Sequence, residues 1–136
     1  MTTDIIKLEE KLLTEEQVDL PVVHKFAKGM YIRELFIPKG TVLVGKRHRH
    51  HTLNMLTKGK MLIYDGVNET IEVEAPYTVE SLPLTKKAGY ALEDSLWVNI
   101  HVTDETDLDK IEEEFIITEE EFNNLIENKG DTKCLG

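Results

Sequence analysis

Short segments in which apolar and polar residues alternate fill the middle of the chain and predict β-structure. Seven such segments, each four to seven residues long, lie between residues 31 and 102. Alternation of this kind places one set of side chains on each face of a strand. The expected strands are Tyr31–Ile37, Thr41–Arg47, Thr52–Thr57, Met61–Tyr64, Thr70–Glu74, Thr78–Ser81 and Leu96–Val102.

The residues between these strands favour tight turns. The turn segments are Pro38-Lys39-Gly40, Lys58-Gly59-Lys60, Asp65-Gly66 and Ala75-Pro76. Many short strands with no helix between them are typical of a sandwich or a barrel. We therefore expect an all-β domain, built as a single barrel over residues 29–103.

Helical patterns are confined to the two ends of the chain. Within residues 1–20, apolar residues recur near helical spacing, and Thr14–Gln17 has the form of a capping box. After residue 103, a helix is expected over Asp107–Phe115, and Thr118 with the three glutamates that follow it opens a second helix. We expect an N-terminal helical arm over residues 1–28 and acidic helices over residues 104–136, with a frayed tail from Gly130.

The size and composition of the chain fit one globular domain, because its 136 residues are 40% hydrophobic and 31% charged. Its longest apolar runs, such as Met61–Tyr64, are far shorter than the about 20 residues that cross a membrane. The first residues lack the basic stretch and apolar run of a secretory signal. Cys134 is the one cysteine, so no disulfide forms within the chain. We expect a cytoplasmic protein with no membrane partner.

Charge is distributed unevenly along the chain. The net charge is −10, yet residues 21–103 carry eight acidic and eleven basic residues, and residues 104–136 carry twelve acidic and three basic ones. An acidic protein without a long basic face is a poor binder of duplex nucleic acid. The mildly basic centre suits a small anionic ligand. Its basic residues are Arg33, Lys46, Arg47, Arg49, Lys86 and Lys87.

The segment Lys46–His51 carries the densest chemical signal, since three of the five histidines lie at positions 48, 50 and 51. If the strand continues, His48 and His50 share one face with Asn54, while Arg47 and Arg49 lie on the other face. Two imidazoles one residue apart on the inner face of a barrel suit a divalent metal ion. The alternative is a pair of histidines that hydrogen-bond a ligand.

These motifs resemble the cupin superfamily, whose fold is a double-stranded β-helix, or jelly-roll barrel. Gly45, His48-Arg49-His50 and Gly59 match the first motif of the family, and Lys87–Leu92 lies where the second motif falls. Asn54 stands in place of the usual Glu ligand, and Leu92 in place of the second-motif His. The resemblance implies one divalent ion (Zn, Fe, Ni or Mn) on His48 and His50, with Asn54, Glu93 or His101 as further ligands.

The chain also resembles small single-domain cupins carried by bacteriophages. The shared phrases are His-x-Phe-x-x-Gly-x-Tyr-x-Arg-Glu over residues 24–34 and Ala-Gly-Tyr-Ala-x-Glu-Asp-x-x-Trp over residues 88–97. Tyr31 and Arg33 lie either in a pocket or on a solvated edge strand. The other pocket candidates follow the Gly89 turn or share the Trp97 face of the last strand: Tyr90, Glu93, Trp97, Asn99 and His101.

Three functions are open at this point. The first is a binding module that holds an anionic, nucleotide-like molecule and, in a bacteriophage, sequesters a host defence signal in the host cytoplasm. The second is a metal-dependent dioxygenase, isomerase or hydrolase that uses His48 and His50. The third, a structural protein with an apolar barrel, is disfavoured by the inward His48, His50 and Asn54. We expect a homodimer, because jelly-rolls often cover a strand edge or sheet face with a second copy.

Overall fold

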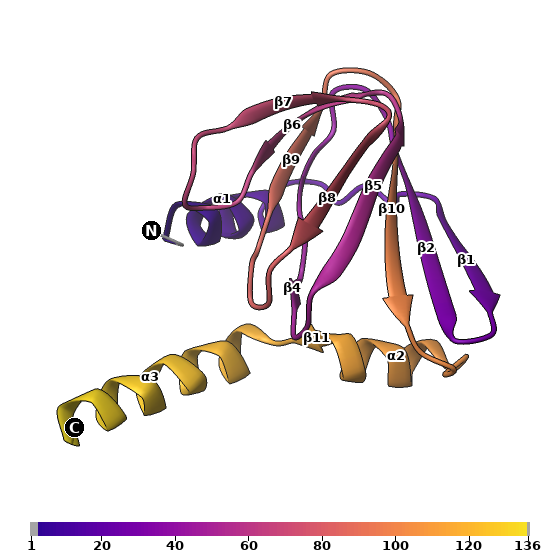
Figure 1. Ribbon diagram of the computed structural model, residues 1–136. Coiled ribbons are helices and arrows are strands. Elements are labelled where there is room, and N and C mark those ends of the chain that lie inside the picture. The colour runs from indigo at the N-terminus through magenta and orange to yellow at the C-terminus, as the bar shows by residue number, and fades with distance from the viewer. Residues whose placement is uncertain (1–2, 136) are drawn as a thin grey trace.

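Two antiparallel sheets face each other and enclose the interior of a barrel (Figure 1). This computed structural model describes residues 3–135, with side chains for residues 4–127. The larger sheet has the order β1-β2-β10-β5-β8, and its strands are Val22–Ala27, Met30–Ile37, Ser95–Val102, Thr52–Lys58 and Tyr77–Ser81. The smaller sheet has the order β3-β9-β6-β7, and its strands are Val42–Val44, Ala88–Ala91, Lys60–Tyr64 and Ile71–Glu74.

The expected all-β barrel is confirmed, and six of the seven predicted strands agree with the structure to within a residue or two. The predicted strand Thr41–Arg47 is instead two strands, β3 and the short β4 (Arg47–His48), with Gly45 between them. Three strands were not predicted. β1 lies within the stretch expected to be a helical arm, β9 lies within the segment identified only as a motif, and β11 (Ile116–Ile117) lies between the two helices expected after residue 103.

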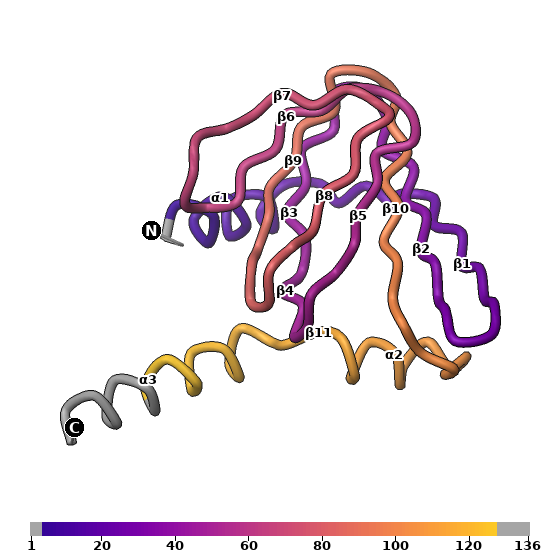
Figure 2. Tube along the Cα trace, in the orientation of Figure 1, coloured from indigo at the N-terminus to yellow at the C-terminus, as the bar shows by residue number. Residues whose placement is uncertain are grey.

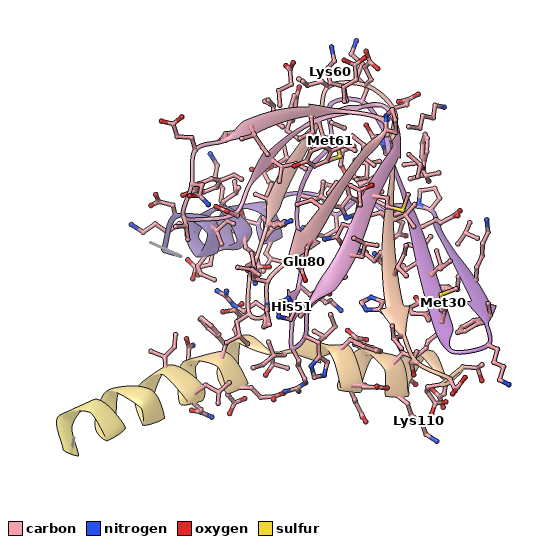
Figure 3. All side chains as sticks on the ribbon, in the orientation of Figure 1. Met30, His51, Lys60, Met61, Glu80 and Lys110 are labelled. Atoms are coloured by element: carbon pink, nitrogen blue, oxygen red, sulfur yellow. The ribbon has the colours of Figure 1, made fainter. Side chains whose placement is uncertain are left out.

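The closed end of the barrel holds the main hydrophobic core. Its fully buried members come from both sheets, so burial of their apolar surface holds the two sheets together. They are Leu35, Ile37, Leu56, Met61, Ile63, Val73 and Ala91. Figure 3 shows Met61 between the sheets, whereas its neighbour Lys60 points away from them. Alternation along β6 thus separates core from surface.

The N-terminal helix α1 (Thr3–Leu13) is shorter than expected and packs near β3 with Ile5 fully buried. The Thr14 hydroxyl donates to the Lys11 carbonyl at the end of this helix, and Gln17 donates back to Leu12. The predicted capping box at Thr14 is therefore wrong, because these side chains end a helix and do not start one. No helix in the described part of the chain is long and apolar enough to span a membrane.

The chain after β10 passes across the open end of the barrel (Figures 1 and 2). α2 (Leu108–Phe115) starts after Asp107, whose side chain accepts hydrogen bonds from the backbone of Asp109 and Lys110. The short strand β11 (Ile116–Ile117) then pairs with β4. α3 (Glu119–Leu135) follows Thr118, whose hydroxyl accepts from the Glu121 N–H, as the capping box predicted. Its helical backbone continues past Gly130, where a frayed tail was expected, and the Cys134 side chain lies outside the described residues.

Candidate functional site

A cavity of about 680 Å³ lies between the two sheets. The hydrophobic core closes one end of this cavity, and α2 covers the other end, its mouth, with Ile111 and Phe115. Such a volume is within the range of cavities that bind small molecules, about 300–1,000 Å³. Side chains from both sheets and from α2 line it, so the site is built by the whole fold.

Strand pairing arranges the inward side chains of the larger sheet in three rows. We call these the floor row next to the core, the middle row, and the mouth row next to α2. The floor row is Val22, Leu35, Trp97, Leu56 and Tyr77. The middle row is His24, Arg33, Asn99, Asn54 and Val79. The mouth row is Phe26, Tyr31 and His101. The cavity therefore changes from apolar to polar to aromatic along its depth.

Two buried amides connect the middle row. The Asn99 side-chain N–H donates to Asn54 Oδ1, and the Asn54 N–H donates to Ser81 Oγ at 2.5 Å. Asn54 and Asn99 are only 3% and 8% exposed. Buried amides are costly unless their hydrogen bonds are made, so this chain of bonds fixes the orientation of both side chains.

Two histidines face each other at the mouth. The rings of His48 and His101 lie 5.3 Å apart, and His48 Nδ1 is hydrogen-bonded to Thr52 Oγ1 at 2.7 Å. Burial lowers the pKa of His48 to about 4, and the charges of Arg33 and Lys87 contribute to this shift. Burial, with the charges of His48 and Arg33, also lowers the pKa of His101 to about 4. Both imidazoles are therefore neutral at pH 7.

An aromatic stack completes the mouth. The Tyr31 ring lies nearly parallel to His101 at 5.8 Å, and the Tyr31 hydroxyl is hydrogen-bonded to His24 Nδ1 at 2.6 Å. Phe115 of α2 packs against His101 with ring centroids 4.5 Å apart. Burial raises the pKa of Tyr31, although the nearby Arg33 charge opposes this rise. Tyr31 therefore stays a neutral hydroxyl that both donates and accepts hydrogen bonds.

Two cations line the cavity without a partner. Neither Arg33 nor Lys87 forms an ion pair or a side-chain hydrogen bond with any described residue. Burial lowers the pKa of Lys87, and Asp65 partly offsets the effect. A half-buried cation without a counter-ion is unfavourable, so the cavity favours a negatively charged occupant.

The other basic residues of the centre are paired with the acidic C-terminal segment, and of these four Lys46 alone lines the cavity. We call residues 107–122 the strap. Arg47 and Lys86 are buried and both pair with Glu119, at 2.9 and 2.7 Å. Arg49 pairs with Glu121 at 2.8 Å, and Lys46 pairs with Glu112. Arg47 also lies 3.7 Å above the Phe122 ring.

Of the predicted site residues, the structure brings six together at the cavity and places three elsewhere. The six are Tyr31, Arg33, His48, Asn54, Trp97 and His101. His50 is exposed, because β4 ends at His48 and the backbone bends at residues 49 and 50, which breaks the alternation. Its predicted inward position is wrong. Tyr90 lies on the outer face of β9, and Glu93 is exposed in the loop before β10.

Sequence reasoning missed three contributors. Ser81 is the partner of Asn54, and this pairing depends on a strand register that the sequence does not reveal. Ile111 and Phe115 cover the mouth, and their separation by four residues on an otherwise acidic helix was an available signal of one buried helix face.

The donor set does not fit the expected metal centre. His48 and His101 are the two imidazoles that face each other. The charged side chains that act on them are cations: Arg33 on both histidines, and Lys87 on His48. No group of three histidine, cysteine, aspartate or glutamate side chains suited to a metal ion exists among the described residues. A divalent cation needs anionic or neutral donors, and the two uncompensated positive charges of Arg33 and Lys87 disfavour its binding by electrostatic repulsion.

Comparison with known proteins identifies the fold. No protein-family model matches the chain, and no curated protein does. The structure of ectoine synthase from P. lautus aligns with this chain over 77% of this chain's length and 83% of its own length, with a TM-score of 0.59 and 15% sequence identity. A cupin superfamily protein from Desulfitobacterium hafniense matches 66% of this chain over 83% of its own, with a TM-score of 0.53 and 11% identity.

An RmlC-like cupin with a double-stranded β-helix fold, from Methanocaldococcus jannaschii, is also similar. It matches 65% of this chain over 84% of its own, with a TM-score of 0.52 and 12% identity. At these identities the likeness concerns the fold alone. The chain has the cupin fold that its sequence motifs predict.

Proposed function

We propose that this cupin barrel binds a small organic anion between its two sheets. The observation that carries the proposal is the pair of cavity-lining cations, Arg33 and Lys87, that have no partner among the described residues. The neighbouring cations Arg47 and Lys86 are each paired with a carboxylate of this chain. The uncompensated positive charge of Arg33 and Lys87 thus lies where a ligand has room.

The neutral groups around these cations support the same proposal. His48 and His101 are uncharged near pH 7 and offer hydrogen bonds without adding charge repulsion. Hydrogen bonds from an arginine to an anionic group are stronger than those between neutral groups. Arg33 is therefore the main anchor of the anion, and Lys87 is the second.

The nature of the ligand follows from the size and lining of the site. The cavity of about 680 Å³ is far larger than an inorganic ion needs, and Tyr31 and Trp97 add aromatic surface. A nucleotide-like molecule combines the required anionic and aromatic parts. If the chain shares the bacteriophage origin that its sequence phrases suggest, the protein would act by sequestering a host defence signal of this kind.

The metal-dependent enzyme is the less favoured alternative. It needs His50 beside His48, and the two side chains do not share a face. Stoichiometric binding of a transition metal that is lost on replacing both His48 and His101 with alanine would restore this alternative.

Calorimetry of matched ligands tests the proposal. We expect nucleoside monophosphates to bind better than the corresponding neutral nucleosides. Arg33→Ala should weaken monophosphate binding by about 1.5–3 kcal/mol, the scale of a hydrogen bond to a charged group. Lys39→Ala, which removes an exposed positive charge outside the cavity, is the control and should have little effect. Equal binding of charged and neutral ligands, or an unaffected Arg33→Ala variant, would overturn the proposal.

A further inference from the structure

Lys87 continues the inner face of the smaller sheet toward the open end of the cavity. It precedes β9 by one residue and has the same strand parity as the core residue Ala91, so its side chain lies between the sheets. The Gly45 N–H donates to the Lys87 carbonyl at 2.9 Å, which extends the pairing of β3 with β9 to this residue. Lys87 lines the main cavity and also a second recess of about 340 Å³, so it lies where the two spaces meet.

The amine of Lys87 has no partner within the described residues, in contrast to the lysine beside it. Lys86 is buried and pairs with two carboxylates, each at 2.7 Å. Lys87 forms no ion pair with a described residue, although Asp65 is close enough to affect its pKa. The Asp65 carboxylate instead accepts three hydrogen bonds within its own turn. The Lys87 amine is therefore available to a molecule in the cavity.

Burial makes this amine a better nucleophile than an exposed lysine. A lysine attacks a carbonyl group only when its amine is unprotonated. Burial lowers the pKa of Lys87, and the charge of Asp65 opposes this shift only in part, so the unprotonated fraction near neutral pH is increased. Desolvated lysines of this kind form Schiff bases with aldehydes and ketones.

The anion site faces Lys87 across the cavity. Arg33 lies on the larger sheet and Lys87 on the smaller one, so the two cations line the same space from opposite walls. The charges of both act on His48, so both side chains lie within electrostatic reach of one ring. Facing sheets are about 10 Å apart, which is a span that two long side chains and a small molecule between them can bridge. An anion held by Arg33 can therefore present its other end to Lys87.

We propose that Lys87 forms a reversible imine with an aldehyde or ketone group of the anion that Arg33 binds. This inference rests on the proposed function, because it takes the anion site as given and assigns a reacting group to the molecule bound there. The ligand class is then an anionic carbonyl compound, which is a phosphate or a carboxylate that also carries an aldehyde or a ketone.

The reaction needs no co-reactant. The unprotonated Nζ of Lys87 adds to the carbonyl carbon, and a proton moves from the nitrogen to the oxygen to give a carbinolamine. The hydroxyl group then leaves as water with the second amine proton, and a carbon–nitrogen double bond remains. A proton from solvent on the imine nitrogen restores the positive charge. The protonated imine therefore keeps the charge complementarity to the anion that the lysine had.

Reductive trapping in the unaltered protein is the first experiment. Pyridoxal 5-phosphate combines an anion with an aldehyde, and pyridoxine 5-phosphate is the matched anion without the aldehyde. With sodium cyanoborohydride and an equimolar amount of pyridoxal 5-phosphate, we expect peptide mapping to show at least about tenfold more label on Lys87 than on the exposed Lys39. An excess of pyridoxine 5-phosphate should prevent this labelling of Lys87, and Arg33→Ala should reduce it.

Pyruvate, trapped in the same way, distinguishes a small carboxylate from an aromatic phosphate as the source of the carbonyl group. Label on Lys87 from either compound supports the inference and identifies the source. If neither compound labels Lys87 more than Lys39, the inference is overturned.

Lys87→Arg separates the charge of this residue from its nucleophilicity. Arginine keeps the positive charge, but its guanidinium is not deprotonated in proteins and cannot replace the amine. We expect this variant to lose the trapped adduct while it binds pyridoxine 5-phosphate, measured by calorimetry, with little change in affinity. Lys39→Arg is the matched control and should keep both the adduct and the affinity. An adduct that persists at the same yield in Lys87→Arg would overturn the inference. Should that variant not fold, the peptide map of the unaltered protein decides.

The outcomes separate this inference from the proposed function. If pyridoxine 5-phosphate binds better than neutral pyridoxine but no carbonyl compound is trapped on Lys87, the anion site stands and the imine inference is overturned. If neither phosphate binds better than pyridoxine and the nucleoside monophosphates bind no better than their nucleosides, the proposed function itself fails.

Discussion

At the scale of single residues, the two mouth histidines couple folding to pH. An unfolded chain protonates His48 and His101 near their ordinary pKa of 6.5, but the folded protein holds both pKa values at about 4. Between these values the unfolded state binds more protons than the folded state. The free energy of unfolding therefore falls as the pH decreases through this window.

We predict that the protein loses up to about 4 kcal/mol of stability between pH 6.5 and 4.5 through these two groups. Urea unfolding at several pH values measures the loss. His101→Phe keeps a ring between Tyr31 and Phe115 but removes one titrating group, so its stability should depend less steeply on pH. The exposed His51, paired with Glu80 at 2.8 Å, provides the control variant His51→Gln (Figure 3). If His51→Gln reduced the pH dependence of the free energy of unfolding as much as His101→Phe does, this assignment would be contradicted.

Gly59 supports a prediction of a steric kind. It lies between β5 and β6 with a φ of +95°, and a Cβ there would lie 2.3 Å from the Ser95 Oγ. Gly59→Ala should therefore destabilise the fold by about 2–4 kcal/mol, measured by thermal or urea unfolding.

Gly29→Ala is the matched control for this substitution. Gly29 also has a positive φ, +78°, but a Cβ there has no neighbour within 4 Å. Only the backbone strain of about 1–2 kcal/mol remains in that variant. Equal losses in the two variants would show that the contact with Ser95 has no part in the effect.

At the scale of secondary-structure elements, ion pairs join the strap to the barrel beside the apolar contacts of the buried Ile111 and Phe115. Glu119 joins two buried cations, Arg47 and Lys86, and Lys86 also pairs with Glu9 at 2.7 Å. Burial alone would raise the pKa of Glu119, but hydrogen bonds and charges from Lys86 and Arg47 outweigh it and lower the pKa. The carboxylate is therefore charged at neutral pH and fixes the start of α3.

We predict that Glu119→Gln destabilises the protein by about 1–2 kcal/mol, because two buried cations lose charge compensation at a partly exposed site. Hydrogen exchange over residues 116–127 should become faster than in the unaltered protein. Glu113→Gln makes the same chemical change at an exposed side chain that makes no hydrogen bond to a described residue. A similar effect from both variants would mean that the loss of any strap charge, and not the contact with Arg47, is responsible.

The elements also show which features a sequence reveals. Alternation identified β2, β5 and β10, because each has one buried and one partly exposed face. It failed at β1, whose Val22–Ala27 shows little burial contrast at the sheet edge, and at β9, which is short and contains Gly89. The same reasoning placed His48 and Asn54 toward the interior but failed for His50, because local alternation cannot anticipate a bend.

The cations show a second limit of sequence reasoning. Arg33, Arg47 and Lys86 look alike in the sequence, and only the tertiary structure separates the partnerless Arg33 from the two that pair with Glu119. The pairing joins residues far apart in the chain. The net charge of a segment therefore predicts the charge of a ligand less reliably than a knowledge of which charged side chains are paired.

At the scale of the whole molecule, exposed apolar side chains gather on the outer face of the larger sheet. The side chains of Val23, Met30, Leu53 and Val102 alternate with the inward residues of their strands and are 49%, 42%, 43% and 81% exposed. Patches of this kind often mark protein–protein contacts. This face is where we expect the second copy of the predicted homodimer to pack.

We predict that the protein is a dimer at micromolar concentration and that Val102→Asp raises the dissociation constant at least about tenfold, since a buried charge at an interface is costly. Size-exclusion chromatography with light scattering measures the mass directly. Val67→Asp introduces the same charge at an exposed valine in the turn between β6 and β7 and should leave the mass unchanged. A monomeric unaltered protein would show the expectation to be wrong.

The position of the strap late in the sequence has a consequence for biosynthesis. Every strand of the two larger sheets lies before residue 103, whereas the segment that covers the mouth and neutralises Arg47 comes afterwards. Ribosomes add about 5–20 residues per second from the N-terminus onward, so the walls of the cavity are made about 1–4 seconds before their cover. A barrel to which the strap has not yet docked is therefore expected to have a wider entrance to its cavity than the finished protein.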